Sequence, residues 1–369
     1  MDQLFGSLKA VFKTDFTVID NHIFRLHYRV TVCILVAFSI VVTARQYIGD
    51  PIDCYSFSDV PKNVLDTFCW IHTTFSLPHA WKKRVGSHVP YPGVDTYVPG
   101  QKRVYHAYYQ WVCFVLFLQA LLFYTPHYFW KAVEGGRIKT LLLDLDKPVM
   151  APAEREKRRG LLVGYLIANV ASHNTLFFSY ALAEILNLAN VIGQMFLIDR
   201  LLGGEFLTYG VQVLQFTEWD SGVRFDPMVK IFPRMTKCTF YDFGTTGDVQ
   251  KFDALCILPI NVINEKIYIF LWFWFVFLAV LSTMALLYRA IILLFPVARY
   301  LVMRCRNVQA DKDYVANICK ATALGDWFVL DILCKNMDSA NFRELVDDYY
   351  VGSVHGRMLG EFNVPGRVW

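Results

Sequence analysis

The sequence predicts an all-α integral membrane protein with four transmembrane helices, and three observations carry this prediction. Tyr108–Trp130 contains no Asp, Glu, Lys or Arg over 23 residues, which is enough helix to cross a hydrocarbon core about 30 Å thick. Aromatic residues crowd both ends of this stretch, where their amphipathic rings favour the headgroup level. The whole chain is 55% hydrophobic and only 18% charged, whereas soluble domains are about 25% charged.

Three further apolar stretches complete the set of four and divide the chain into segments. In order these are an N-terminal segment (1–25), the first transmembrane helix (26–47), a long loop (48–105), the second helix (106–130), a shorter loop (131–175), the third helix (176–202), a second long loop (203–266), the fourth helix (267–296) and a C-terminal region (297–369) with helical periodicity. Pro126, in the last turn of the second helix, is expected to kink it.

The positions of the cysteines predict which loops lie outside the cell. An even number of spans places both termini on one side of the membrane, and Lys and Arg near the spans favour the cytoplasm for that side. Each long loop carries two cysteines, Cys54 and Cys69 in the first and Cys238 and Cys256 in the second. Disulfides persist on an oxidising side, so we expect both loops to be extracellular and stapled. Four cysteines permit three pairings, and the cysteine count leaves the choice open.

The third span is less apolar than the others and carries a polar stripe. Glu184, Asn187, Asn190 and Gln194 fall within about a third of the helix circumference. A stripe of this kind in a membrane helix faces protein or water rather than lipid. It predicts either a hydrogen-bonded seam between helices or a surface that faces water.

The first 13 residues predict a short amphipathic helix. Leu4 and Leu8 recur at helical spacing on one face, and Asp2, Gly6 and Lys9 fall on the opposite face. Such a helix either lies on the membrane surface or folds into a pore formed by several subunits. In the second arrangement Met1, Asp2, Gly6 and Lys9 line the pore, and Asp2 favours cations.

The sequence contains no motif for catalysis or for binding a cofactor or metal. P-loop, dinucleotide-binding, zinc-protease and nucleophile-elbow patterns are absent. His22 and His27 have the spacing of one histidine box of membrane di-iron desaturases, but the further boxes are missing. A net charge of +4 without a basic stripe argues against nucleic acid. An oligomeric channel, an adhesion protein and a membrane enzyme remain, and a channel would need a ring of subunits because one four-helix bundle has little room for a wide aqueous path.

Several motifs in matching order resemble innexins, the invertebrate gap-junction proteins. They are YYQWV at Tyr108–Val112, VPYPGV at Val89–Val94, FPRMTKC at Phe232–Cys238, DALCILPIN at Asp253–Asn261, NEKIYIFLWFW at Asn264–Trp274, GDWF at Gly325–Phe328 and KNMD at Lys335–Asp338. The resemblance runs nearly the whole length, up to about Tyr350.

The resemblance implies a large-pore channel in the plasma membrane and no enzyme activity. Subunits, alone or with other innexins, form a ring of eight, and two rings dock through their extracellular loops to pass ions and small metabolites between neighbouring cells. The partners are then other subunits, the docking hemichannel and membrane lipid. The resemblance, together with the distances of the cysteines from the spans, favours nested bridges, Cys54–Cys256 and Cys69–Cys238. The alternatives are an undocked, pannexin-like release channel and a four-span adhesion protein of the claudin or tetraspanin kind.

Overall fold

The computed structural model describes residues 17–56, 60–147, 150–218, 227–308 and 310–358. The chain divides into two compact units, each made of separate stretches of sequence. The first unit comprises residues 1–29, 124–188 and 280–369, and the second comprises residues 30–123 and 189–279. The long apolar helices contribute residues to both units.

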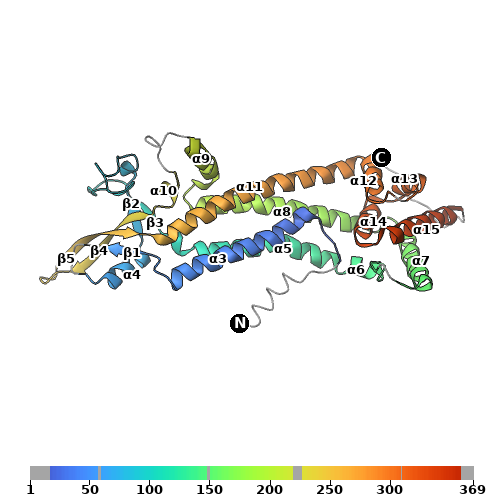
Figure 1. The fold of residues 1–369 in the computed structure, drawn as a ribbon, viewed down its shortest axis with the longest axis horizontal. Helices are drawn as coiled ribbons and strands as arrows, with labels where there is room; N and C mark the ends of the chain where they lie inside the picture. The colour runs from blue at the N-terminus through green and yellow to red at the C-terminus, as the bar shows by residue number, and fades with distance from the viewer. Residues whose placement is uncertain (1–16, 57–59, 148–149, 219–226, 309, 359–369) are drawn as a thin grey trace. The chain divides into compact units, whose positions relative to one another are not determined.

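Within the described residues, four helical stretches are long and apolar enough to cross a membrane, as the sequence predicts (Figure 1). They are His22–Tyr47, formed by α2 (His22–Arg25), a π-helical stretch (Leu26–Thr31) and α3 (Val32–Tyr47), followed by α5 (Val112–Glu134), α8 (Asn174–Leu201) and α11 (Pro259–Leu294). At about 1.5 Å of rise per residue, even α5 exceeds a hydrocarbon core of about 30 Å.

The ends of these helices differ from the predicted ends where local chemistry overrides hydropathy. The first span begins at His22 rather than at residue 26, because the Asn21 side chain accepts a hydrogen bond from the Phe24 N–H at 2.7 Å and caps it. Helix α11 begins at Pro259 rather than at residue 267, since proline suits the first turn of a helix. Pro126 lies inside α5, and a kink there remains a prediction.

The two long loops form one five-stranded antiparallel sheet, so the chain is not all-α as predicted. The strands are β1 (Asp53–Tyr55), β2 (Thr74–Ser76), β3 (Val104–His106), β4 (Met235–Phe243) and β5 (Val249–Ile257), in the order β1-β5-β4-β2-β3. Strands β4 and β5 form a hairpin from the second loop, and strands of the first loop pair with both of its edges. The helical prediction failed here because three of the strands have only three residues each and gain their pairing partners from distant sequence.

Short helices complete the second unit around this sheet (Figure 1). They are α4 (Lys62–His72), the 3₁₀ turns Pro78–Ala80 and Tyr108–Gln110, α9 (Phe206–Glu218) and α10 (Pro227–Ile231). Helix α4 lies beside β1 and β4. Gly210 in α9 faces the Trp272 ring of α11 so closely that a Cβ there would lie 2.1 Å from a ring carbon. Only glycine fits this contact between α9 and α11.

The first unit contains a small helical domain built largely from the C-terminal region. Its helices are α6 (Arg137–Leu142), α7 (Pro152–Ala168), α12 (Pro296–Arg306), α13 (Lys312–Ala321), α14 (Leu324–Asn336) and α15 (Ser339–Met358). Helix α14 is buried on all sides from Gly325 to Leu333. The core around it includes Trp130, Tyr180 and Phe328. The helices of this domain agree with the helical periodicity of the sequence in the C-terminal region.

Candidate channel-forming elements

Two disulfides join the two long loops. Cys54 in β1 is bonded to Cys256 in β5, which is its direct partner in the strand register, with Cα atoms 4.0 Å apart. Cys69 in α4 is bonded to Cys238 in β4, with Cα atoms 5.9 Å apart. The sequence separations are 202 and 169 residues. The connectivity is therefore nested, and both bridges cross from one loop to the other.

Charged side chains hold further parts of the two loops together. The Lys237 ammonium in β4 contacts the Asp253 carboxylate at 3.0 Å and the Asp95 carbonyl oxygen at 3.1 Å. Asp95 in turn accepts a hydrogen bond from Lys83 at 2.5 Å, which together with the Thr96 N–H lowers the pKa of its carboxyl to about 2. The Asp95 carboxylate therefore stays ionised across the physiological pH range and keeps Lys83 in place.

A buried histidine belongs to the same sheet. His106 in β3 contacts the Ser76 hydroxyl of β2 at 2.8 Å. Burial lowers the pKa of His106 to about 4, so the imidazole is neutral at physiological pH. The pairing of β2 and β3 thus encloses an uncharged polar contact.

The polar stripe of the third span lies on α8, and its first two residues are closed to solvent. Glu184 is only 4% exposed, and Asn187 is equally buried. Both line a cavity of about 10 Å³, which is the space of a single water molecule. Farther along α8, the Gln194 amide donates to the Asn190 side-chain oxygen at 3.1 Å. Within one subunit, Glu184 and Asn187 face protein.

Glu184 has a charged partner that the sequence analysis did not predict. Arg289, inside the apolar helix α11, donates from Nε and Nη2 to the two Glu184 carboxylate oxygens at 2.8 and 2.9 Å. Asn21 also donates to Glu184, at 2.8 Å, and the Arg289 guanidinium lies 4.9 Å from the centre of the Tyr180 ring. The signal was present in the sequence as one arginine within a long apolar run, because such residues are paired with an opposite charge.

The N-terminal pore residues proposed from the sequence, Met1, Asp2, Gly6 and Lys9, lie outside the described residues. The chain that follows them is tied to the first unit at three points. Val18 exchanges two hydrogen bonds with the Asn336 side chain of α14, at 2.5 and 2.7 Å. The Trp130 indole donates to the Ile19 carbonyl oxygen at 3.1 Å, and the Asn21 N–H donates to the Tyr180 hydroxyl at 3.0 Å. Residues 18–21, at the end of the N-terminal segment, are therefore fixed on α5, α8 and α14.

The described residues offer one group of three side chains with the spacing of metal ligands, namely Cys54, Cys69 and Cys256. All three sulfurs belong to the disulfides, so they are not available as thiolate ligands. His27, half of the spacing that resembles a histidine box, contacts the Ser282 hydroxyl at 2.7 Å.

Comparison with known proteins agrees with these features. The family model named Innexin matches residues 20–351. The chain is 49% identical to Innexin inx2 of Schistocerca americana over 94% of this chain and 97% of that protein. It is 48% identical to Innexin inx2 of Drosophila melanogaster (94% and 95% covered) and 47% identical to Innexin shaking-B of the same fly (94% and 94%). With four apolar helices, two disulfides and a family match over nearly its whole length, the chain belongs to the innexins, a family of multi-pass gap-junction channel proteins.

Proposed function

We propose that this chain is the subunit of a ring-shaped hemichannel that docks with a second ring and passes ions and small metabolites between adjacent cells. Both termini lie in the cytoplasm, and residues 48–105 and 203–266 lie outside. The ring contains other innexin subunits, of the same or another kind, and the family resemblance implies eight of them. The sheet of the second unit then provides the docking surface.

The observation that carries the proposal is the covalent joining of the two long loops. Two bridges link loops that are separated by two transmembrane helices in sequence, and the sheet interleaves strands from both loops. A surface that must meet an identical surface on another cell gains affinity when it is preorganised, because less conformational entropy is lost on docking. A sheet with two cross-loop disulfides supplies that rigidity.

The N-terminal segment supplies the proposed pore lining. The chain that follows the predicted helix is fixed at Val18 by Asn336, and only residues 14–21 separate that helix from the first span, which begins at His22. The helix must therefore stay near its own subunit, and a ring of subunits brings the copies of Asp2, Gly6 and Lys9 together around one opening. The polar stripe of α8 has a structural role in this proposal, since Glu184 faces Arg289 within the subunit.

Dye transfer between paired cells tests the proposal against its two alternatives. Pairs in which both cells express the chain should transfer a small fluorescent dye, and mixed pairs with one non-expressing cell should not, because docking needs two rings. Dye uptake by single cells without transfer in pairs would instead indicate an undocked release channel. Cell adhesion with neither uptake nor transfer would indicate an adhesion protein.

A further inference from the structure

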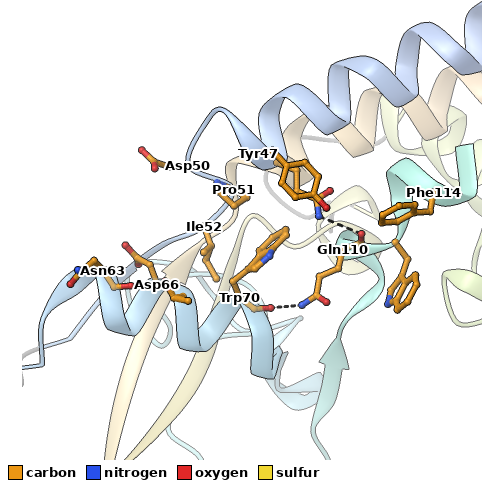
Figure 2. Close-up of a pocket in the computed structure, with 12 residues that line it drawn as sticks. Tyr47, Asp50, Pro51, Ile52, Asn63, Asp66, Trp70, Gln110 and Phe114 are labelled. Carbon is orange, nitrogen blue, oxygen red and sulfur yellow. Dashed lines mark hydrogen bonds between the residues drawn. The ribbon is translucent and has the colours of Figure 1, made fainter. Parts of the chain in front are cut away.

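A cavity of about 560 Å³ lies within the second unit, where the first two spans meet the first long loop. Its walls come from the end of α3, from the following segment up to Ile52, from α4 and from the beginning of α5 (Figure 2). All of these lining residues belong to one unit and to the described part of the chain. The size suits a ligand of drug-like dimensions.

Aromatic side chains form one part of the wall. Tyr47, Trp111 and Phe114 are 67%, 59% and 57% exposed, and Trp70 of α4 also lines the cavity. In Figure 2 the labelled Tyr47, Trp70 and Phe114 lie around Gln110, whereas Asp66 and Asn63 lie farther along α4. Tyr47 ends the first span and Phe114 is in the first turn of the second, so this wall lies at the level of a membrane surface.

The charge of the lining has one sign. Asp50 and Asp66 are among the twelve lining residues, and none of the twelve is Lys, Arg or His. Asp66 is held in place because one of its oxygens accepts a hydrogen bond from the Cys54 N–H at 2.6 Å. An anion in this cavity would meet two carboxylates and no base, whereas a cation would meet both carboxylates and the faces of aromatic rings.

Hydrogen bonds connect the elements that line the cavity, so the cavity is formed without a ligand. The Gln46 amide donates to the Gln110 carbonyl oxygen at 3.4 Å, and the Gln110 amide donates to the Trp70 carbonyl oxygen (Figure 2). These two bonds tie α3, α4 and the 3₁₀ turn that precedes α5 to one another. Helix α4 is also anchored by the Cys69–Cys238 disulfide. Helix α4 with Trp70, and the Asp66 carboxylate, are therefore held in place before any ligand arrives.

We propose that this cavity binds an organic ammonium group, with its positive charge between the aromatic wall and the carboxylates of Asp50 and Asp66. Quaternary ammonium groups suit such a site because they are weakly hydrated and are attracted to the faces of aromatic rings. The group can come from a free organic cation or from the choline head of a membrane lipid. Only the placement of the cavity on the extracellular side rests on the proposed function. Binding itself does not require a channel.

The protonation of Asp66 gives the site a pH dependence. Burial raises the pKa of the Asp66 carboxyl, the nearby Asp53 and Asp50 raise it further, and the Cys54 N–H and Lys62 lower it. A bound cation favours the ionised form. Acidification through the pKa of Asp66 should therefore weaken binding, and neutral or higher pH should restore it.

The test uses the full chain, purified and placed in phosphatidylglycerol nanodiscs that contain no choline lipid. Phenyltrimethylammonium is titrated by equilibrium dialysis, with tryptophan fluorescence as a second readout. Asp66→Asn and Trp111→Leu should each weaken binding by about tenfold, from the loss of a charge or of a cation–π contact worth about 1–2 kcal/mol. Asp248→Asn and Tyr128→Leu, exposed positions outside the cavity, are matched controls that should bind like the unaltered chain.

A second arm identifies the source of the group. The protein is transferred to mixed phosphatidylcholine and phosphatidylglycerol nanodiscs, and the lipid that it retains is identified by native mass spectrometry. Selective retention of phosphatidylcholine, lost in Asp66→Asn, indicates the lipid, whereas binding of phenyltrimethylammonium without such retention indicates a free cation. Absence of both, or equal affinity in all variants, overturns the proposal. Dye transfer is measured separately, in paired cells that express the same variants. A failure of binding and a failure of the channel function are therefore observed independently.

Discussion

Glu184 of α8 and Arg289 of α11 form a bidentate ion pair in the first unit, with N–O distances of 2.8 and 2.9 Å. Asn21 donates to the same carboxylate, so the pair also holds the residue that caps the first span. The Glu184 side chain is 4% exposed and the Arg289 side chain is 11% exposed. One buried ion pair therefore joins three of the four spans.

Removing one partner of this pair should be costly. Glu184→Leu and Glu184→Gln both leave the Arg289 charge buried without a counter-ion, which destabilises a protein by about 3–5 kcal/mol. The double variant Glu184→Leu with Arg289→Leu should recover much of this loss, because no uncompensated charge remains. Denaturation of the purified protein and delivery to the cell surface measure the effect. Glu156→Gln, at an exposed position, is the control, and equal stability of Glu184→Leu and this control would disprove the role of the pair.

The sequence predicted the local features of this fold and missed those that depend on distant residues. The four spans were predictable because a long apolar run identifies a membrane helix without knowledge of its neighbours. The sheet was not, since Cys54 pairs with Cys256, 202 residues away, and a three-residue strand has no pattern of its own. Arg289 was missed for the same reason, because its partner Glu184 is 105 residues away. The stripe on α8 indicated a surface turned away from lipid, and the sequence left open whether that surface faces protein or water.

Peptide mapping under non-reducing conditions should recover Cys54 joined to Cys256 and Cys69 joined to Cys238. Cys54→Ser, Cys256→Ser and their double variant should lose similar stability, about 2–4 kcal/mol, because any one of them removes the same bridge. Cys305→Ser, which alters an exposed free cysteine, should leave stability unchanged. A peptide that links Cys54 to Cys69 would contradict this connectivity.

Accessibility of inserted epitopes should distinguish the two sides of the membrane. The β4–β5 turn at Gly247 is a suitable position in the second loop, because nothing lies within 4 Å of a Cβ placed there. The epitope is inserted beside Gly247 and the glycine is kept, since its φ of +84° favours glycine. Gly93 is unsuitable because a Cβ would lie 2.8 Å from the Trp81 indole nitrogen. Antibody should label an epitope at Gly247 on intact cells, and an epitope after Val351 only once the cells are permeabilised. The reverse pattern would invert the proposed topology.

Asn336→Ala should release the chain that leads to the N-terminal segment. The variant loses both hydrogen bonds to Val18, which together contribute about 1–3 kcal/mol. Limited proteolysis should then cut faster between residues 10 and 20. Asn341→Ala removes a buried hydrogen bond to the Leu145 carbonyl oxygen elsewhere in the same unit and controls for general loss of stability. Equal cutting rates in the two variants would show that Asn336 does not anchor the segment.

Asp2 should set the charge preference of the pore. In a ring its copies lie close together, so Asp2→Asn and Asp2→Lys should progressively reduce the preference for cations. High salt should diminish the difference by screening. A charged thiol reagent should change the open-channel current from cysteines placed at Asp2 or Lys9 but not at Leu8. Unchanged current and selectivity in all variants would place the helix outside the pore.

The interleaved sheet also sets the order of events during biosynthesis. The hairpin of β4 and β5 separates β1 from β2 and β3. Strand β1 therefore has no partner, and the β2–β3 pair has no further strand beside it, until the second loop has been made. The two halves of the Cys54–Cys256 bridge are 202 residues apart, about 10–40 s of synthesis at 5–20 residues per second. During that interval Cys54 and Cys69 are both thiols without their native partners. Completion of the sheet is therefore a late step that requires the last strand, and a subunit truncated before Cys238 can form neither bridge.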